Sequence, residues 1–213
     1  MCVEKHMATR DHTLYKMEEG IFWFTTSIVE HKNVFVTKEY FDVIINSFKY
    51  FEKEKKVRTV LYCIIPNHLH WSFKLPSGTN DPINVYRNFK RHTAVNILDN
   101  LKNESKCGMY KMLKLFNNNT SCARHLPENL LQIFECKAIN KKQNYAVWQE
   151  KPDLKIIVNE DFFLEKLNYC HRNPLQYKWQ LVDDPADYPY SSCRFYEYGE
   201  EWNGLNIYNP LGC

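Results

Sequence analysis

The order of predicted strands and helices constrains the fold of this chain more than any other feature of its sequence. β-branched and aromatic runs, apolar residues at helical spacing and turn dipeptides divide the first hundred residues into five elements. These are a strand, a helix, two strands joined by the turn Pro66-Asn67, and a second helix, at 21–30, 38–56, 57–65, 68–76 and 82–103. This order is most of a ferredoxin-like α+β sandwich, which has a central antiparallel sheet and needs one more strand.

The missing strand and a further helix are predicted in the last third of the chain. Residues 144–158 contain an apolar run that predicts the last strand with its loop. A helix over 159–173 begins at Asn159, a preferred N-cap residue, and is stopped by Pro174. The fold therefore gains an added C-terminal helix beyond the ferredoxin-like elements.

The length and composition suit one domain with elaborations. The chain has 213 residues, of which 44% are hydrophobic, enough for a sizeable core. We expect a polar N-terminal arm at 1–20, a single domain at 21–200 and a C-terminal tail at 201–213. Residues 104–142 show no clear periodicity, so we expect an insertion there with two short helices.

Charge and cysteine content narrow the class of protein only slightly. The net charge of +3 permits a local nucleic-acid-binding patch but does not argue for one. No C-x-x-C pair occurs among the eight cysteines, which argues against a zinc ribbon or a thioredoxin-like motif. Neither a signal peptide nor an apolar run of about 18 residues is found. We therefore expect a cytoplasmic protein with free thiols and no membrane association.

His68 and His70 are the first candidates for chemistry. Residues i and i+2 of a strand point to the same face, so the two imidazoles project side by side and Leu69 faces the opposite side. Two adjacent imidazoles suit a divalent metal. The alternative is a chance pair of strand histidines without a ligand.

Tyr169 and Asn173 form a second candidate pair on the C-terminal helix. Positions i and i+4 share one helix face, so a phenol and an amide oxygen are presented towards one point. The amide oxygen can bind a hard metal ion and the phenol is a possible nucleophile. The alternative is a tyrosine at the margin of the core on an amphipathic helix.

A third candidate is a basic ridge on the second helix. Arg87 and Arg91 are one turn apart and Lys90 lies beside them, which suits the binding of phosphate groups. A solvated helix face explains the same pattern equally well.

Two motifs in order carry a resemblance to a known family. The first is IIPNHLHWSF at 64–73, and the second is WQEKPDLKIIVNEDFFLEKLNYCHRNPLQY at 148–177, followed by DYPYSS at 187–192. In this order they resemble the signatures of the single-tyrosine HUH transposases, especially the REP-associated tyrosine transposases. The resemblance covers roughly 20–100 and 144–198 and leaves the insertion unmatched.

The resemblance implies an activity and a role for each candidate residue. Tyr169 is expected to be the catalytic nucleophile, and His68, His70 and Asn173 to bind Mg²⁺ or Mn²⁺. The implied reaction is cleavage and strand transfer of single-stranded, hairpin-flanked DNA through a 5′-phosphotyrosine, by a monomer or homodimer. Basic residues are frequent in relatives at Lys90 and Arg91, which favours DNA contact there together with Arg87.

Other functions remain open at this point. A domesticated nickase that cuts repeat hairpins without mobilising itself has the same sequence features. A non-catalytic module would bind RNA through aromatic side chains on an exposed sheet face. A small metalloenzyme would combine the two histidines with a carboxylate such as Asp153 or Glu150. Trp71 and Trp148 are either base-stacking side chains or, as we favour, parts of the core.

Overall fold

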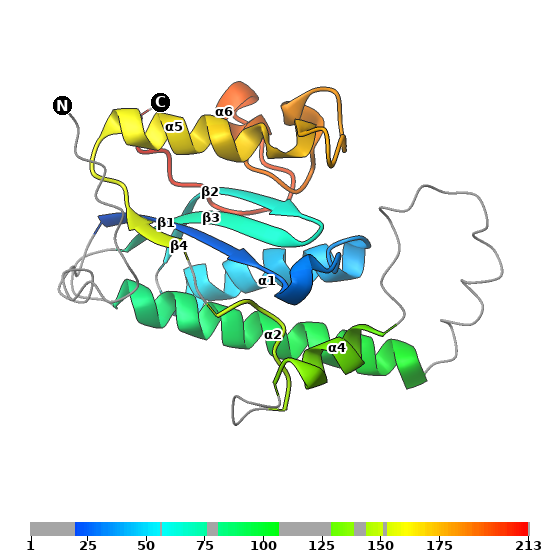
Figure 1. Ribbon diagram of the computed structural model, residues 1–213. Coiled ribbons are helices and arrows are strands. Elements are labelled where there is room, and N and C mark those ends of the chain that lie inside the picture. Colours follow the sequence, from blue (N-terminus) through cyan, green and yellow to red (C-terminus); the bar gives the residue numbers. More distant parts are fainter. Residues whose placement is uncertain are drawn as a thin grey trace.

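A four-stranded antiparallel sheet forms the centre of the protein (Figure 1). The computed structural model describes residues 20–55, 57–75, 81–106, 129–138, 144–150 and 153–212. The strands are β1 (Gly20–Ser27), β2 (Arg58–Ile65), β3 (His68–Leu75) and β4 (Asp153–Ile156), in the spatial order β2-β3-β1-β4. This confirms the predicted ferredoxin-like sandwich, including a last strand from beyond the insertion.

Helices cover both faces of the sheet (Figure 1). Helices α1 (Lys38–Lys55) and α2 (Pro82–Lys106) lie on one face, and α5 (Glu160–His171) lies on the other. The Asn159 side chain accepts a hydrogen bond from the backbone N–H of Phe162, 2.8 Å away, which confirms the predicted N-cap. The shorter elements are η2 (Val29–His31), α4 (Leu130–Cys136), η3 (Asn173–Leu175), η4 (Pro185–Asp187) and α6 (Cys193–Tyr198).

Alternation along the strands divides the core into two layers. Phe22 and Phe24 on β1 point into the larger cluster, with α1 and α2, whereas Trp23 between them belongs to the cluster under α5. Trp71 is fully buried in the larger cluster and Trp148 is also buried, so both are core residues, as we favoured. At roughly 25 cal/mol per Å² of apolar surface, each of these aromatic side chains stabilises the fold by several kcal/mol.

The C-terminal segment packs against β2. The Tyr62 hydroxyl donates a hydrogen bond to Glu201 Oε1 at 2.8 Å, and the backbone N–H of Tyr208 donates to the Thr59 carbonyl oxygen at 2.8 Å. Leu205 is buried in the larger core cluster. The segment from 201 that was expected as a tail therefore contributes to the core.

Parts of the expected organisation lie outside the described residues. These include residues 1–19 of the arm expected at 1–20 and most of the insertion expected at 104–142, in which α2 ends and α4 is the one helix that begins among the described residues. In the described part of the chain, the helices are all too short or too polar to cross a membrane. Cys63, Cys136, Cys170 and Cys193 are described and are free thiols, as expected.

Candidate active site

His68 and His70 lie side by side on β3, at the face that α5 covers. Their ring centroids are 4.9 Å apart, with the ring planes nearly perpendicular. Trp23, which belongs to the cluster under α5, stacks on His70 with a centroid distance of 5.2 Å. The predicted pairing of the two imidazoles on one strand face is therefore present in the structure.

Hydrogen bonds orient the ring of His68. Asn67 donates from Nδ2 to the His31 carbonyl oxygen at 3.0 Å, so its Oδ1 faces the other way, 2.8 Å from His68 Nδ1. Because this amide oxygen can only accept, Nδ1 of His68 carries the hydrogen. The lone pair of the neutral ring is then on Nε2.

Asn173 and Thr25 orient the ring of His70 in the same sense. The amide nitrogen Nδ2 of Asn173 lies 3.0 Å from His70 Nε2 and donates to it, and the Thr25 hydroxyl oxygen lies 3.0 Å from Nδ1. The hydrogen of the neutral ring is therefore on Nδ1, which donates to Thr25. A hydrogen bond with the protonated form of His68 places the Asn173 side chain beside both imidazoles.

Both imidazoles are held in the neutral form. Burial lowers the pKa of His68 to about 4, and the positive charge of Lys178 acts in the same direction, while the hydrogen bond with Asn173 opposes it. Burial also lowers the pKa of the fully buried His70, with smaller effects from His68 and Lys166. At neutral pH each ring therefore has an unprotonated nitrogen that can bind a cation.

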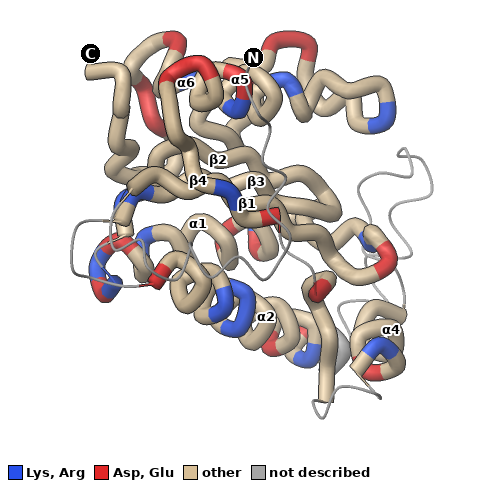
Figure 2. The backbone as a smooth tube through the Cα atoms, turned by 60° about the vertical axis from the view of Figure 1, so that its left-hand side comes forward, with Lys and Arg blue, Asp and Glu red and all other residues tan. Residues whose placement is uncertain are grey.

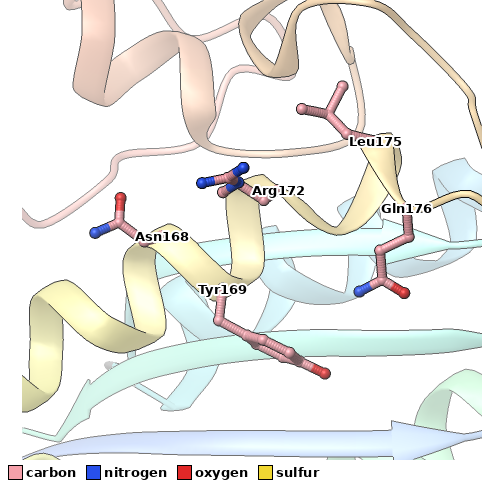
Figure 3. A pocket seen from close by; sticks show the side chains of 5 residues that line it. All are labelled: Asn168, Tyr169, Arg172, Leu175 and Gln176. Atoms are coloured by element: carbon pink, nitrogen blue, oxygen red, sulfur yellow. The ribbon is translucent and has the colours of Figure 1, made fainter.

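Tyr169 closes the site from α5. Its ring centroid lies 5.1 Å from that of His70, at an interplanar angle of 76°, and its side chain is 50% exposed. The phenol lines an open pocket of about 340 Å³ together with Asn168, Arg172, Leu175 and Gln176 (Figure 3). A half-exposed phenol thus lies next to the fully buried imidazole of His70 and the partly buried imidazole of His68.

A buried polar network fixes α5 against β2. His171 Nε2 lies 3.0 Å from the Ser192 hydroxyl, which also accepts a hydrogen bond from the Tyr62 backbone N–H at 3.0 Å. The Tyr188 hydroxyl donates to the Ile64 carbonyl oxygen at 2.7 Å. The DYPYSS segment therefore positions the helix that carries Tyr169, a role that the sequence pattern did not indicate.

The structure brings four of the seven predicted site residues together. His68, His70, Tyr169 and Asn173 converge from β3 and from the α5–η3 segment. Helix α5 ends at His171, and Asn173 begins η3 within the next turn. Tyr169 and Asn173 therefore keep nearly helical spacing. The roles of these residues in catalysis and metal binding stay predictions.

The predicted basic ridge lies away from this cluster. Arg87, Lys90 and Arg91 are on α2, which covers the opposite face of the sheet from α5 and carries several basic positions (Figures 1 and 2). Arg87 and Arg91 are exposed, whereas the Lys90 ammonium donates to the Gln149 carbonyl oxygen. DNA contact by this ridge stays a prediction, and the ridge does not share a surface with Tyr169.

The geometry offers little support for two of the alternative functions. Among the described residues, no group of three or more His, Cys, Asp or Glu side chains could hold a metal, which gives no support to a triad of the two histidines with Asp153 or Glu150. Asp153 is exposed and forms an ion pair with Lys155 at 3.4 Å. Core clusters cover both faces of the sheet, so the described residues present no open aromatic sheet face for RNA.

Sequence reasoning missed the residues that orient the ligand candidates. Thr25 faces His70 because β1 pairs with β3 in the register Thr25↔His70, and Asn67 is oriented by the His31 carbonyl group. For Asn67, the position next to His68 in the sequence could have indicated this role. Nothing in a single sequence gives the β1–β3 register.

The comparisons with known proteins agree with this arrangement. No protein-family model matches the chain. A curated Haemophilus influenzae protein named as a REP-associated tyrosine transposase is 24% identical over 193 residues, which span 87% of this chain and 88% of that protein. The structure of a REP-associated tyrosine transposase bound to a REP hairpin covers 94% of this chain and 92% of its own, with a TM-score of 0.56 and 16% identity. The resemblance carried by the two motifs is thus confirmed: the chain is similar to a REP-associated tyrosine transposase in sequence over most of its length, and shares the fold of these proteins.

Proposed function

We propose that the chain is a transposase-like enzyme that cuts and rejoins single-stranded, hairpin-flanked DNA through a covalent link to Tyr169. The observation that carries this proposal is the position of an exposed phenol ring 5.1 Å from the buried imidazole of His70, whose Nε2 contacts Asn173. A relative named as a transposase, and a similar fold solved with a REP hairpin, support DNA as the substrate.

The proposed reaction is a reversible transesterification at phosphorus. The Tyr169 oxygen attacks the scissile phosphate, the bond from phosphorus to the 3′ oxygen breaks, and the strand leaves with a free 3′-hydroxyl. The phenol gives up its proton and the leaving oxygen gains one, so the total is unchanged. Because the 5′-phosphotyrosine keeps the energy of the original ester bond, a 3′-hydroxyl can reverse the step and join strands without ATP.

The donor set fits a divalent cation, for which we propose Mn²⁺ or Mg²⁺. His68 and His70 each offer a lone pair on Nε2, and their Nδ1 atoms donate to Asn67 and Thr25, as metal-binding histidines do with supporting residues. Asn173 would supply an amide oxygen after its side chain turns the oxygen towards His70. A bound ion would polarise the scissile phosphate and neutralise the charge that develops on it.

The charge around the two histidines favours a phosphate. Lys166, which also pairs with Glu165 at 2.8 Å, lies close enough to affect His70, and Lys178 affects His68. Among the described residues, no carboxylate shifts either histidine pKa. Manganese and magnesium normally bind oxygen ligands, often including substrate phosphates. The proposed ion and the DNA phosphate therefore bind this site together. The phosphate supplies the negatively charged oxygen ligands that the ion prefers, and the ion adds positive charge that attracts the phosphate.

A covalent-adduct assay tests the proposed function. We expect the protein, incubated with Mn²⁺ and a labelled hairpin that has an unpaired flank, to give a slower band on a denaturing gel. Tyr169→Phe removes one exposed hydroxyl, so it should lose the adduct and keep DNA binding. Tyr198→Phe, at another exposed tyrosine, is the matched control and should keep both. DNA binding without an adduct in the unmodified protein would favour a non-catalytic binding module and refute the proposal.

A further inference from the structure

The turn that follows η3 connects the Tyr169 pocket to the histidine pair. Leu175 at the end of η3 and Gln176 at the beginning of the turn line that pocket (Figure 3). Trp179 near its end has its ring centroid 6.1 Å from that of His68. A strand of nucleic acid with its scissile phosphate at the site would therefore pass this turn.

Tyr177 projects from the middle of the turn into solvent. Its side chain is 92% exposed, the largest exposed fraction among the large hydrophobic side chains described. The backbone beneath it is ordered by hydrogen bonds from the N–H of Trp179 and of Gln180 to the Gln176 carbonyl oxygen, at 2.7 and 3.0 Å. A single exposed aromatic is common on protein surfaces, so exposure alone indicates nothing. Here, however, the ordered backbone of the turn presents the ring beside the candidate active site.

Two basic residues of the same segment lie close to Tyr177 in the chain. Lys178 follows it directly, with its ammonium 4.6 Å from the Trp179 ring centroid, and Arg172 precedes it and lines the Tyr169 pocket. Within the described part of the chain, neither Arg172 nor Lys178 forms an ion pair with a carboxylate. An exposed aromatic ring with basic residues nearby in the same segment is a combination that binds single strands, because the ring stacks on a base and the cations bind phosphates.

We propose that Tyr177 stacks on an unpaired base next to the scissile phosphate, while Arg172 and Lys178 bind the backbone on either side of that base. This assignment rests on the proposed function, since it takes the cleaved single strand as the ligand. It makes Tyr177 a positioning residue: the ring holds the strand in place and does not touch the reacting atoms.

Binding measurements in a cleavage-deficient background test this assignment. All variants carry Tyr169→Phe, and each is titrated with two labelled DNAs, a hairpin with an unpaired flank and the same hairpin without it. A second set of flanked hairpins has 2-aminopurine at one unpaired position each, because stacking on an aromatic ring quenches its fluorescence. Tyr177→Phe keeps the aromatic face, and Tyr50→Ala removes an exposed tyrosine from α1, on the opposite face of the sheet.

We expect Tyr177→Ala to weaken binding of the flanked hairpin by about 5- to 150-fold, the range for loss of one base–aromatic stack. It should leave the unflanked hairpin unaffected and abolish the quenching at one position. Tyr177→Phe and Tyr50→Ala should behave like the parent. Lys178→Ala should reduce the salt dependence of binding the flanked hairpin by roughly 0.7 in slope.

Equal affinity of Tyr177→Ala and its parent for the flanked hairpin would overturn the assignment. An equal loss for both hairpins would overturn it as well, because the ring would then act on the stem or on the fold. Failure of the proposed function would be seen in a different experiment, in which the protein with Tyr169 intact would form no adduct. The binding comparisons need no cleavage, so the two outcomes are distinguishable.

Discussion

Replacing Thr25 by Val isolates the hydrogen bond that sets the protonation pattern of His70. The two side chains have nearly the same shape, and the change removes the hydroxyl 3.0 Å from His70 Nδ1. His70 is fully buried, so water cannot take the place of this acceptor. The hydrogen then moves to Nε2, where Asn173 can accept it after turning its amide group.

The size of the effect follows from the cost of an unsatisfied buried donor. Leaving Nδ1–H without an acceptor costs about 1–3 kcal/mol, which favours the other tautomer by roughly 5- to 150-fold. Cation binding needs the lone pair on Nε2, so the apparent metal affinity falls by about the same factor. Loss of residues that support metal-binding histidines costs about 10–100-fold in metal affinity or activity, which agrees with this range.

The assay measures adduct formation by Thr25→Val at a series of Mn²⁺ concentrations. We expect the curve to shift to Mn²⁺ concentrations about 10- to 100-fold higher, with nearly the same plateau and little change in melting temperature. Thr26→Val is the matched control, since Thr26 is buried on the same strand and its hydroxyl has no hydrogen-bond partner among the described residues. Superimposable curves for the unmodified protein and Thr25→Val would refute the tautomer argument.

Other predictions concern the metal, the basic ridge and the packing of α5. His68→Ala should abolish adduct formation but leave the metal-free melting temperature nearly unchanged, because His68 lies at the edge of the buried region; a collapse of the fold would favour a structural histidine. Calorimetric titration of Tyr169→Phe with Mn²⁺ should give weak binding alone and tighter binding with hairpin DNA, since Lys166 and Lys178 oppose a lone cation. Neutralising Arg87, Lys90 and Arg91 should lower the salt slope of DNA binding by up to about 2, at roughly 0.7 per contact, and equal slopes would remove α2 from the DNA-binding surface. Ser192→Ala should lower the unfolding free energy by about 1–3 kcal/mol, measured by urea denaturation, because it leaves the Tyr62 backbone N–H unpaired; an unchanged midpoint would contradict this.

Local periodicity was enough to predict which residues of the site face one another along one element. His68 and His70 share a strand face, and Tyr169 and Asn173 share a helix face, because side-chain direction repeats with the period of the backbone. Contacts between different elements could not be predicted in this way. Thr25 and His70 are 45 positions apart, and a shift of one residue in the β1–β3 register would turn Thr25 to the other face.

The C-terminal segment was the least predictable of the described parts for a related reason. Residues 201–213 contain no periodic pattern, yet Glu201 accepts a hydrogen bond from the buried Tyr62 hydroxyl, and Leu205 is part of the core. Irregular segments are held by individual side chains that reach distant partners. Such contacts leave no repeating signal in the amino-acid sequence.

The separation of the basic ridge from Tyr169 could have been derived from the predicted fold. The two helices of the ferredoxin-like unit pack on one face of the sheet, and Leu69 and Trp71 point into that layer. Alternation along β3 then directs His68 and His70 to the opposite face, away from α2. A DNA molecule that contacts both Arg91 and Tyr169 must therefore pass around an edge of the sheet, with different segments of the substrate at the two places. A salt slope that depends on α2 only for hairpins with a long stem would be the signature of that arrangement.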